Sequence, residues 1–81
     1  MKIEVLGPGC NRCEQLYANT NEAVSAFDPS KSIEVIKITD IMHFAKMGVL
    51  MTPGLVIDGE VVSTGKVLSP EDIKQIIEEK L

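Results

Sequence analysis

Two cysteines, and no others, occur in this chain of 81 residues, and only two residues separate them. They are Cys10 and Cys13, within the segment GPGCNRC. A disulfide that closes so short a loop adds little to stability, because the stabilisation grows with the length of the closed loop. The pair is therefore better suited to exchanging electrons or holding a metal than to stapling the fold.

The residues after the first cysteine have the spacing of one helix face. The face consists of Cys13, Leu16, Tyr17, Thr20, Ala23, Val24 and Phe27. This period predicts that Cys13 points into the core and that Cys10 lies one turn earlier, at the accessible start of the helix. Such an asymmetric pair suits dithiol exchange, in which one thiolate attacks a disulfide and the second thiol resolves the product.

The start of a helix also favours a thiolate at Cys10. Unpaired backbone N–H groups and the positive end of the helix dipole stabilise negative charge there. The pKa of a CxxC cysteine in this position falls to about 3.5–7.5, from about 8.5 for free cysteine. Asn11 and Arg12 lie between the two cysteines, and Arg12 adds the charge of the only arginine, whereas Glu14 opposes it. We expect a lowered pKa.

Metal binding is the competing chemistry for the pair. Zinc usually takes four ligands, and His43 is the only histidine available beside the carboxylates, so an intrachain zinc site is disfavoured. A linear Cu(I) site needs only two thiolates and suits a soft metal. A Cu(I) carrier therefore stays open, although small copper-carrying domains usually end on a strand, and this chain ends on a predicted helix.

The remaining pattern predicts one α/β domain over residues 1–81, in the order β-α-β-α-β-β-α. Strands are expected at 2–6, 33–39, 54–57 and 60–63, and helices after the first cysteine, at 41–47 and from Pro70 to the end. Asp58-Gly59 is a strong hairpin signal. Ser69 and Asp72 form a variant capping box around Pro70, and the last helix should bury a stripe. The stripe comprises Ile73, Ile76, Ile77 and Leu81.

The segment MTPGLVIDGEVV at 51–62, taken together with GPGCNRC, resembles the thioredoxin superfamily. The chain is similar to its small, glutaredoxin-sized members, sometimes called redox-active disulfide protein 2, over essentially its whole length. The resemblance implies a thioredoxin fold, with a central mixed four-stranded sheet flanked by three helices. It also implies a thiol–disulfide oxidoreductase that acts as a disulfide reductase.

The same resemblance implies roles for five residues. Cys10 is the attacking nucleophile and Cys13 the resolving thiol. Pro53 follows a cis peptide bond, so that Thr52 presents its backbone to an extended substrate, which pairs with it as an added strand. Gly65 borders that substrate groove. Met42, Met51 and Tyr17, together with Arg12, are expected at the rim.

The chain departs from its relatives at several positions. It lacks the Trp before the first cysteine and the Gly-Pro between the two, and no Asp aligns with the buried carboxylate that helps deprotonate the resolving thiol. A glutathione-dependent glutaredoxin is a second alternative, which is not favoured because STGKVLSPED lacks the glycine pair of glutaredoxins. A redox-sensing interaction protein is a third.

Charge and hydropathy limit the partners. The net charge is −4 and the lysines are scattered, so nucleic acid is not expected. No apolar run approaches the roughly 20 residues that span a bilayer, and the strand pattern KIEVL already begins at Lys2, so we expect no signal peptide and a cytoplasmic protein.

Without a nucleotide-binding loop, we expect no bound cofactor. Electrons would come from a separate thioredoxin-reductase-type donor and pass to disulfide-containing proteins. An acidic surface without an evident apolar stripe favours a monomer.

Overall fold

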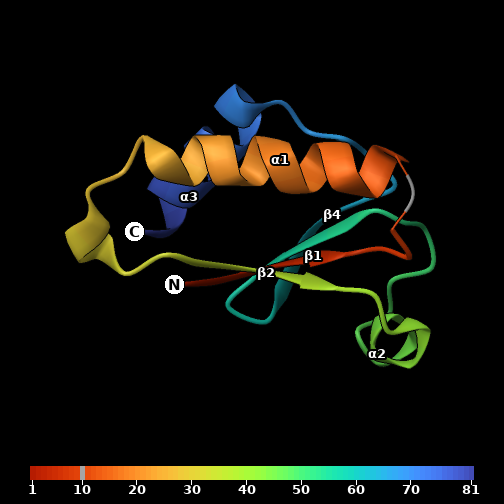
Figure 1. The fold of residues 1–81 in the computed structure, drawn as a ribbon. Helices are drawn as coiled ribbons and strands as arrows, with labels where there is room; N and C mark the ends of the chain where they lie inside the picture. The colour runs from red at the N-terminus through yellow and green to blue at the C-terminus, as the bar shows by residue number, and fades with distance from the viewer. Residues whose placement is uncertain (10) are drawn as a thin grey trace.

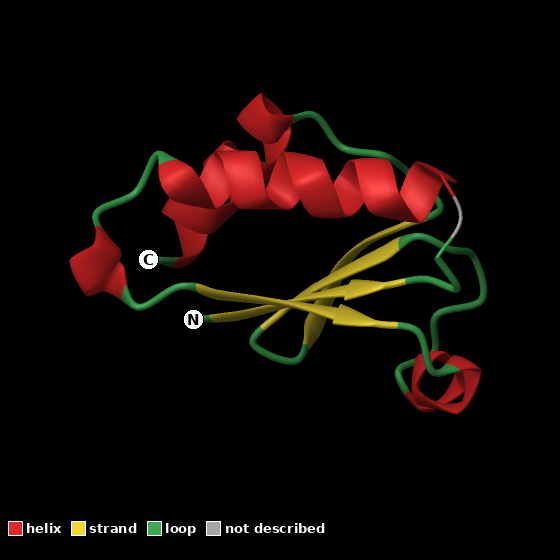
Figure 2. Cartoon of the chain, in the orientation of Figure 1, coloured by secondary structure: helices red, strands yellow, loops and turns green. Residues whose placement is uncertain are grey.

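A computed structural model of the chain describes residues 1–9 and 11–81. Within them the elements follow the predicted order β-α-β-α-β-β-α (Figure 1). The strands are β1 (Lys2–Leu6), β2 (Glu34–Ile38), β3 (Gly54–Ile57) and β4 (Glu60–Thr64). The helices are α1 (Asn11–Ser25), α2 (Ile41–Lys46) and α3 (Pro70–Lys80), with a short 3₁₀-helix at Pro29–Lys31 (Figure 2).

The strands form one mixed sheet in the order β2-β1-β3-β4. β1 and β2 are parallel, and α1 makes the crossover between them, whereas β3 runs antiparallel to both β1 and β4. The predicted fold class, a mixed four-stranded sheet flanked by three helices, is therefore confirmed. β1 and β3 occupy the centre, which explains why their apolar side chains are the most deeply buried in the sheet.

The sheet has a separate apolar cluster on each face. Alternate strand residues point to opposite faces, so Ile3 and Val5 pack with α1 and α3, whereas Leu6 packs with Phe44 of α2. α1 and α3 lie together on one side of the sheet, and α2 lies on the other side, at the end of the sheet where α1 begins (Figure 1). Both chain termini lie at the opposite end (Figure 1).

The first helix ends earlier than its apolar pattern. α1 stops at Ser25, and Phe27 lies in the following turn, where its backbone N–H donates to the carbonyl oxygen of Val24 (3.0 Å) and its side chain still packs against the core. The backbone N–H of Ser30 then donates to the Asp28 carboxylate (2.9 Å), and this bond lowers the pKa of Asp28.

Local signals are confirmed at the hairpin and at the last helix. Asp58 and Gly59 both have positive φ, 49° and 84°, as a type I′ turn requires. The Ser69 side chain accepts from the backbone N–H of Asp72 (3.2 Å), and Pro70 opens α3. Leu81 was wrongly assigned to the buried stripe: its side chain is 55% exposed, because α3 ends at Lys80 and the chain leaves the core there.

The second strand is shorter and more exposed than predicted. β2 covers Glu34–Ile38 rather than 33–39, and it is an edge strand. Its apolar side chains are half-buried, whereas the ammonium of Lys37 pairs with Glu14 of α1 and lies 5.2 Å from the centroid of the Tyr17 ring. These contacts tie the edge of the sheet to α1.

A buried carboxylate connects the central strand to α2. Glu4 of β1 is 8% exposed, and its Oε2 lies 3.2 Å from Nε2 of His43. We predict that His43→Ala lowers the free energy of unfolding by about 1–3 kcal/mol, because it leaves a buried acceptor without its partner. Urea unfolding measures this loss.

The control for this prediction removes both groups. The double variant Glu4→Leu/His43→Ala should recover much of the loss, since replacing both partners by apolar groups costs far less than orphaning one of them. If the double variant were less stable than His43→Ala, the pair would not be the source of the effect.

Candidate functional site

The second cysteine of the pair is buried at the start of α1. Cys13 lies in the first turn of the helix and is 1% exposed, as its place in the apolar period predicts. Cys10, the predicted nucleophile, immediately precedes the helix in sequence and lies outside the described residues. Asn11 and Arg12 begin the helix and are exposed.

A glycine before the pair makes room for the buried thiol. Gly7 follows β1 and is itself buried. A Cβ added there would meet Sγ of Cys13 and lie 2.8 Å from its Cβ, which is closer than such atoms approach in proteins. The Gly7 backbone N–H donates to the carbonyl oxygen of Ile38 (2.9 Å), so the strand end is also fixed to β2. The absence of a side chain at Gly7 therefore lets Cys13 pack against the strand end.

Three predicted site residues, far apart in sequence, are joined by hydrogen bonds. The peptide bond between Thr52 and Pro53 is cis. The backbone N–H of Gly65 donates to the carbonyl oxygen of Pro53 (2.9 Å), and a terminal nitrogen of Arg12 donates to the carbonyl oxygen of Gly65 (2.7 Å). The start of α1, the entry to β3 and the exit from β4 therefore meet at one place.

Gly65 occupies a conformation that suits glycine. Its φ is +70°, in the left-handed region where a side chain is strained. A Cβ there would also lie 3.3 Å from Cβ of Met51. The exposed Met51 thus lies beside Gly65, as expected for a rim residue, whereas Tyr17 is half-buried and packs against the core beneath α1. Met42 is exposed on α2.

An apolar groove of about 360 Å³ lies between the segment before the cysteine pair and α2. Pro8 and Thr52 line it together with Ile41, Phe44, Ala45, Val49 and Leu50. Two of the lining side chains are strongly exposed: Leu50 at 93% and Ile41 at 69%. The prediction of a surface without an apolar stripe is therefore wrong, because Ile41 at the start of α2 and Leu50 in the segment after it both expose their side chains beside this groove.

Sequence reasoning missed Ile41 and Leu50 as site residues. A signal was present in Val49-Leu50-Met51, three consecutive apolar residues between a helix-ending glycine and a strand. Such a run in a connecting segment either packs inward or remains exposed for binding. Val49 does the first and Leu50 the second, and only the folded chain distinguishes them.

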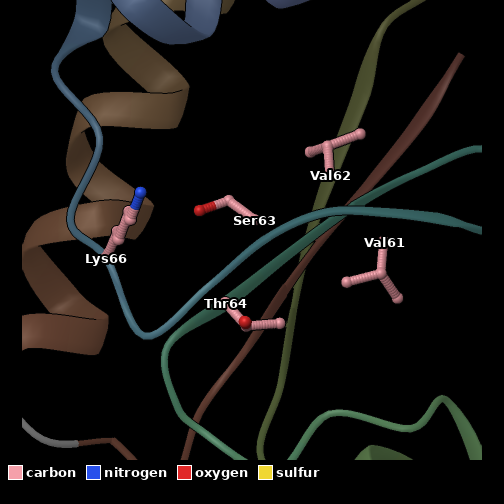
Figure 3. A pocket seen from close by; sticks show the side chains of 5 residues that line it. All are labelled: Val61, Val62, Ser63, Thr64 and Lys66. Atoms are coloured by element: carbon pink, nitrogen blue, oxygen red, sulfur yellow. The ribbon is translucent and has the colours of Figure 1, made fainter.

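A second hollow, of about 340 Å³, lies beside the edge strand β4. Val61, Val62, Ser63, Thr64 and Lys66 line it, and the Ser63 hydroxyl and the Lys66 ammonium extend toward the same space (Figure 3). Within the described part of the chain, the buried Ser63 Oγ has no hydrogen-bond partner. Thr64 and Lys66, which flank Gly65 in sequence, both line this hollow.

Potential metal ligands are dispersed in the described residues. Across 1–9 and 11–81, no three His, Cys, Asp or Glu side chains gather as a metal site would require. His43 of α2 is already paired with Glu4 of β1. Nor does any helix within these ranges have the length and apolarity needed to cross a bilayer.

Comparison with known proteins gives consistent matches. Residues 1–78 match the thioredoxin domain family. A thioredoxin of Methanothermobacter thermautotrophicus is 39% identical over 77 residues, which cover 95% of this chain and 97% of the relative. A thioredoxin of Methanocaldococcus jannaschii is 37% identical over 73 residues, which cover 90% of this chain and 81% of the relative.

Proposed function

The chain belongs to the thioredoxin family, and on that premise we propose that it is a disulfide reductase working through Cys10 and Cys13. Family membership supports a thiol–disulfide oxidoreductase kind of function. One structural observation supports the specific proposal: Cys13 is buried in the first turn of α1, next to Arg12. The Arg12 side chain donates to the Gly65 carbonyl oxygen, and the Gly65 N–H donates to the Pro53 carbonyl oxygen, so the cis-proline segment lies close to this turn.

The proposed reaction transfers two electrons from the dithiol to a substrate disulfide. The Cys10 thiolate attacks one sulfur of the substrate, the substrate S–S bond breaks, and the leaving sulfur takes up a proton. Cys13 then loses its proton and attacks Sγ of Cys10. The mixed disulfide breaks, the second substrate sulfur leaves as a thiol, and Cys10–Cys13 remain oxidised.

The dithiol must then be regenerated by a partner. We propose a separate reductase of the thioredoxin-reductase type as the electron donor and disulfide-containing proteins as the substrates. The proposal places the protein in the cytoplasm, because a reducing compartment keeps such a dithiol ready to attack.

Substrate binding is proposed along the groove beside Thr52. An extended peptide would pair with the Thr52 backbone as an added strand, and its side chains would enter the apolar groove that Pro8 and Leu50 line. Exposed apolar surface of this kind marks interaction sites. Gly65, next to Pro53, would border the same peptide.

Leu50 gives a direct test of the groove. We predict that Leu50→Ser raises KM for an oxidised protein substrate by roughly 3–10-fold, since burying a leucine side chain contributes about 1.5–3 kcal/mol and only part of it enters the interface. The free energy of unfolding should change little, because this side chain is almost fully exposed.

The matched control is Leu81→Ser, at the opposite end of the molecule (Figure 1). It removes an exposed leucine without touching the groove, and KM should stay at the wild-type value. An equal rise in KM for both variants would point to a loss of nonspecific hydrophobic attraction to the substrate and would contradict the assignment of the groove.

The activity itself is tested by insulin disulfide reduction with dithiothreitol as electron source. The proposal expects precipitation of the insulin B chain well ahead of the uncatalysed reaction. A wild-type rate equal to that of dithiothreitol alone would overturn it. In that case, turnover of glutathionylated peptide that requires glutathione would favour the glutaredoxin alternative, and stoichiometric copper after anaerobic purification would favour the Cu(I) carrier.

A further inference from the structure

Arg12 lies between the two cysteines in sequence, but its side chain is bonded to a distant loop. Its guanidinium donates to the carbonyl oxygen of Gly65 at 2.7 Å, across 53 residues of sequence. The Gly65 N–H in turn donates to the carbonyl oxygen of Pro53 at 2.9 Å. We propose that Arg12 is a positioning residue that clamps the start of α1 to the Pro53 and Gly65 segments, and thereby fixes the start of α1 relative to the Thr52 backbone with which the substrate would pair. This inference rests on the proposed reductase function.

The bond to Gly65 is of the stronger kind. A hydrogen bond from a charged donor is shorter than a neutral one and roughly twice as strong, and 2.7 Å is at the short end of the usual range. The acceptor residue is also held by a second bond, since the Gly65 N–H donates to the carbonyl oxygen of Pro53. The clamp therefore acts on a loop whose backbone is already confined.

A clamp at this place affects the reaction through geometry. Cys13 belongs to the first turn of α1 and Cys10 precedes this helix in sequence, whereas Thr52 and Pro53 belong to the segment entering β3. Substrate pairing with Thr52 brings a disulfide to Cys10 only if these segments keep a fixed separation. Displacements of about 1 Å can cost as much as 10²-fold in rate, so a bond that spans the two sides contributes directly to catalysis.

The clamp competes with a different role for Arg12, in which its charge lowers the pKa of the nucleophile. Substitutions separate the two. Arg12→Lys keeps the positive charge but replaces the planar guanidinium by a single ammonium group at the end of a different side chain. Arg12→Met keeps much of the apolar stem and removes both the charge and the donors. Lys66→Met is the matched control, because Lys66 is an exposed cation next to Gly65 without a described bond to it.

The first measurement is amide hydrogen exchange at Gly65, which needs no activity. We expect exchange of the Gly65 N–H to accelerate by about tenfold in Arg12→Met and by a similar factor in Arg12→Lys, since the loop opens more often once its carbonyl is released. Lys66→Met should leave this exchange unchanged. Wild-type protection in both Arg12 variants would overturn the clamp, whether or not the protein reduces disulfides.

The second measurement connects the clamp to turnover. For an oxidised protein substrate, kcat/KM should fall by roughly tenfold in both Arg12 variants. The pH profile of iodoacetamide alkylation, which reports the thiolate, should stay in place for Arg12→Lys. An unchanged kcat/KM in Arg12→Lys, together with a shifted alkylation profile in Arg12→Met, would assign Arg12 to charge and not to positioning. No reductase activity in the wild type, with fast Gly65 exchange in the variants, would keep the clamp and reject the proposed function.

Discussion

Replacing Cys10 by serine is expected to reduce insulin disulfide reduction to the rate of dithiothreitol alone. A serine hydroxyl does not ionise near neutral pH and cannot form a mixed disulfide, so both electron-transfer steps stop. The catalysed component should fall by at least about 10³-fold, as for other enzymes that lose a nucleophile. The assay is the one that tests wild-type activity, run at equal protein concentration.

Cys13→Ser is the informative comparison, because it removes only the second step. The Cys10 thiolate still attacks, but no internal thiol releases the substrate, so a covalent complex accumulates until external dithiothreitol cleaves it. Mass spectrometry of the quenched mixture should show the protein plus one substrate chain. If the adduct formed instead in Cys10→Ser and not in Cys13→Ser, the roles of the two cysteines would be exchanged.

Gly7→Ala is expected to have the second largest effect, on stability and turnover together. The new methyl group would meet Sγ of Cys13 and lie 2.8 Å from its Cβ, at a place where both residues are buried. The strand end has little freedom to retreat, since its N–H is bonded to Ile38. Overpacking of this kind lowers the free energy of unfolding by about 1–3 kcal/mol. Urea unfolding gives the value.

The same substitution should slow resolution of the mixed disulfide. Pushing Cys13 away from its position moves the resolving thiol out of line with the Cys10 sulfur, and we expect a loss of about 10- to 10²-fold in that step. Single-turnover release of a labelled substrate peptide measures it. Initial alkylation of Cys10 should change much less, because the substitution affects the partner thiol and not the nucleophile.

A double-mutant cycle with Cys13→Ala isolates the contact. Removing Sγ relieves the closer of the two clashes, so the cost of Gly7→Ala should fall in that background, with a coupling energy of about 1–3 kcal/mol. Additive costs would mean that the two residues do not interact and would contradict the packing of Cys13 against the strand end.

Much of this protein was predictable from short segments. The Asp58-Gly59 turn, the Ser69 cap of α3 and the inward-facing Cys13 depend on backbone conformations and periods that a few neighbouring residues determine. The order of the elements followed from these local preferences, and the fold class from the resemblance. The CxxC at the predicted start of a helix indicated dithiol exchange or soft-metal binding, because cysteine spacing and helix position are local properties too, and the role of Thr52-Pro53 came from the resemblance.

Only the tertiary structure decided which distant groups meet. The Arg12–Gly65 bond, the fit of Gly7 against Cys13 and the Glu4–His43 pair join residues that no local pattern relates. It also decided that Leu50 and Ile41 stay exposed while Val49 is buried, since that depends on which face of the sheet α2 covers. Sequence thus determined the cysteine pair and the order of the elements that follow it, whereas long-range packing determined the groove beside the Pro8 segment.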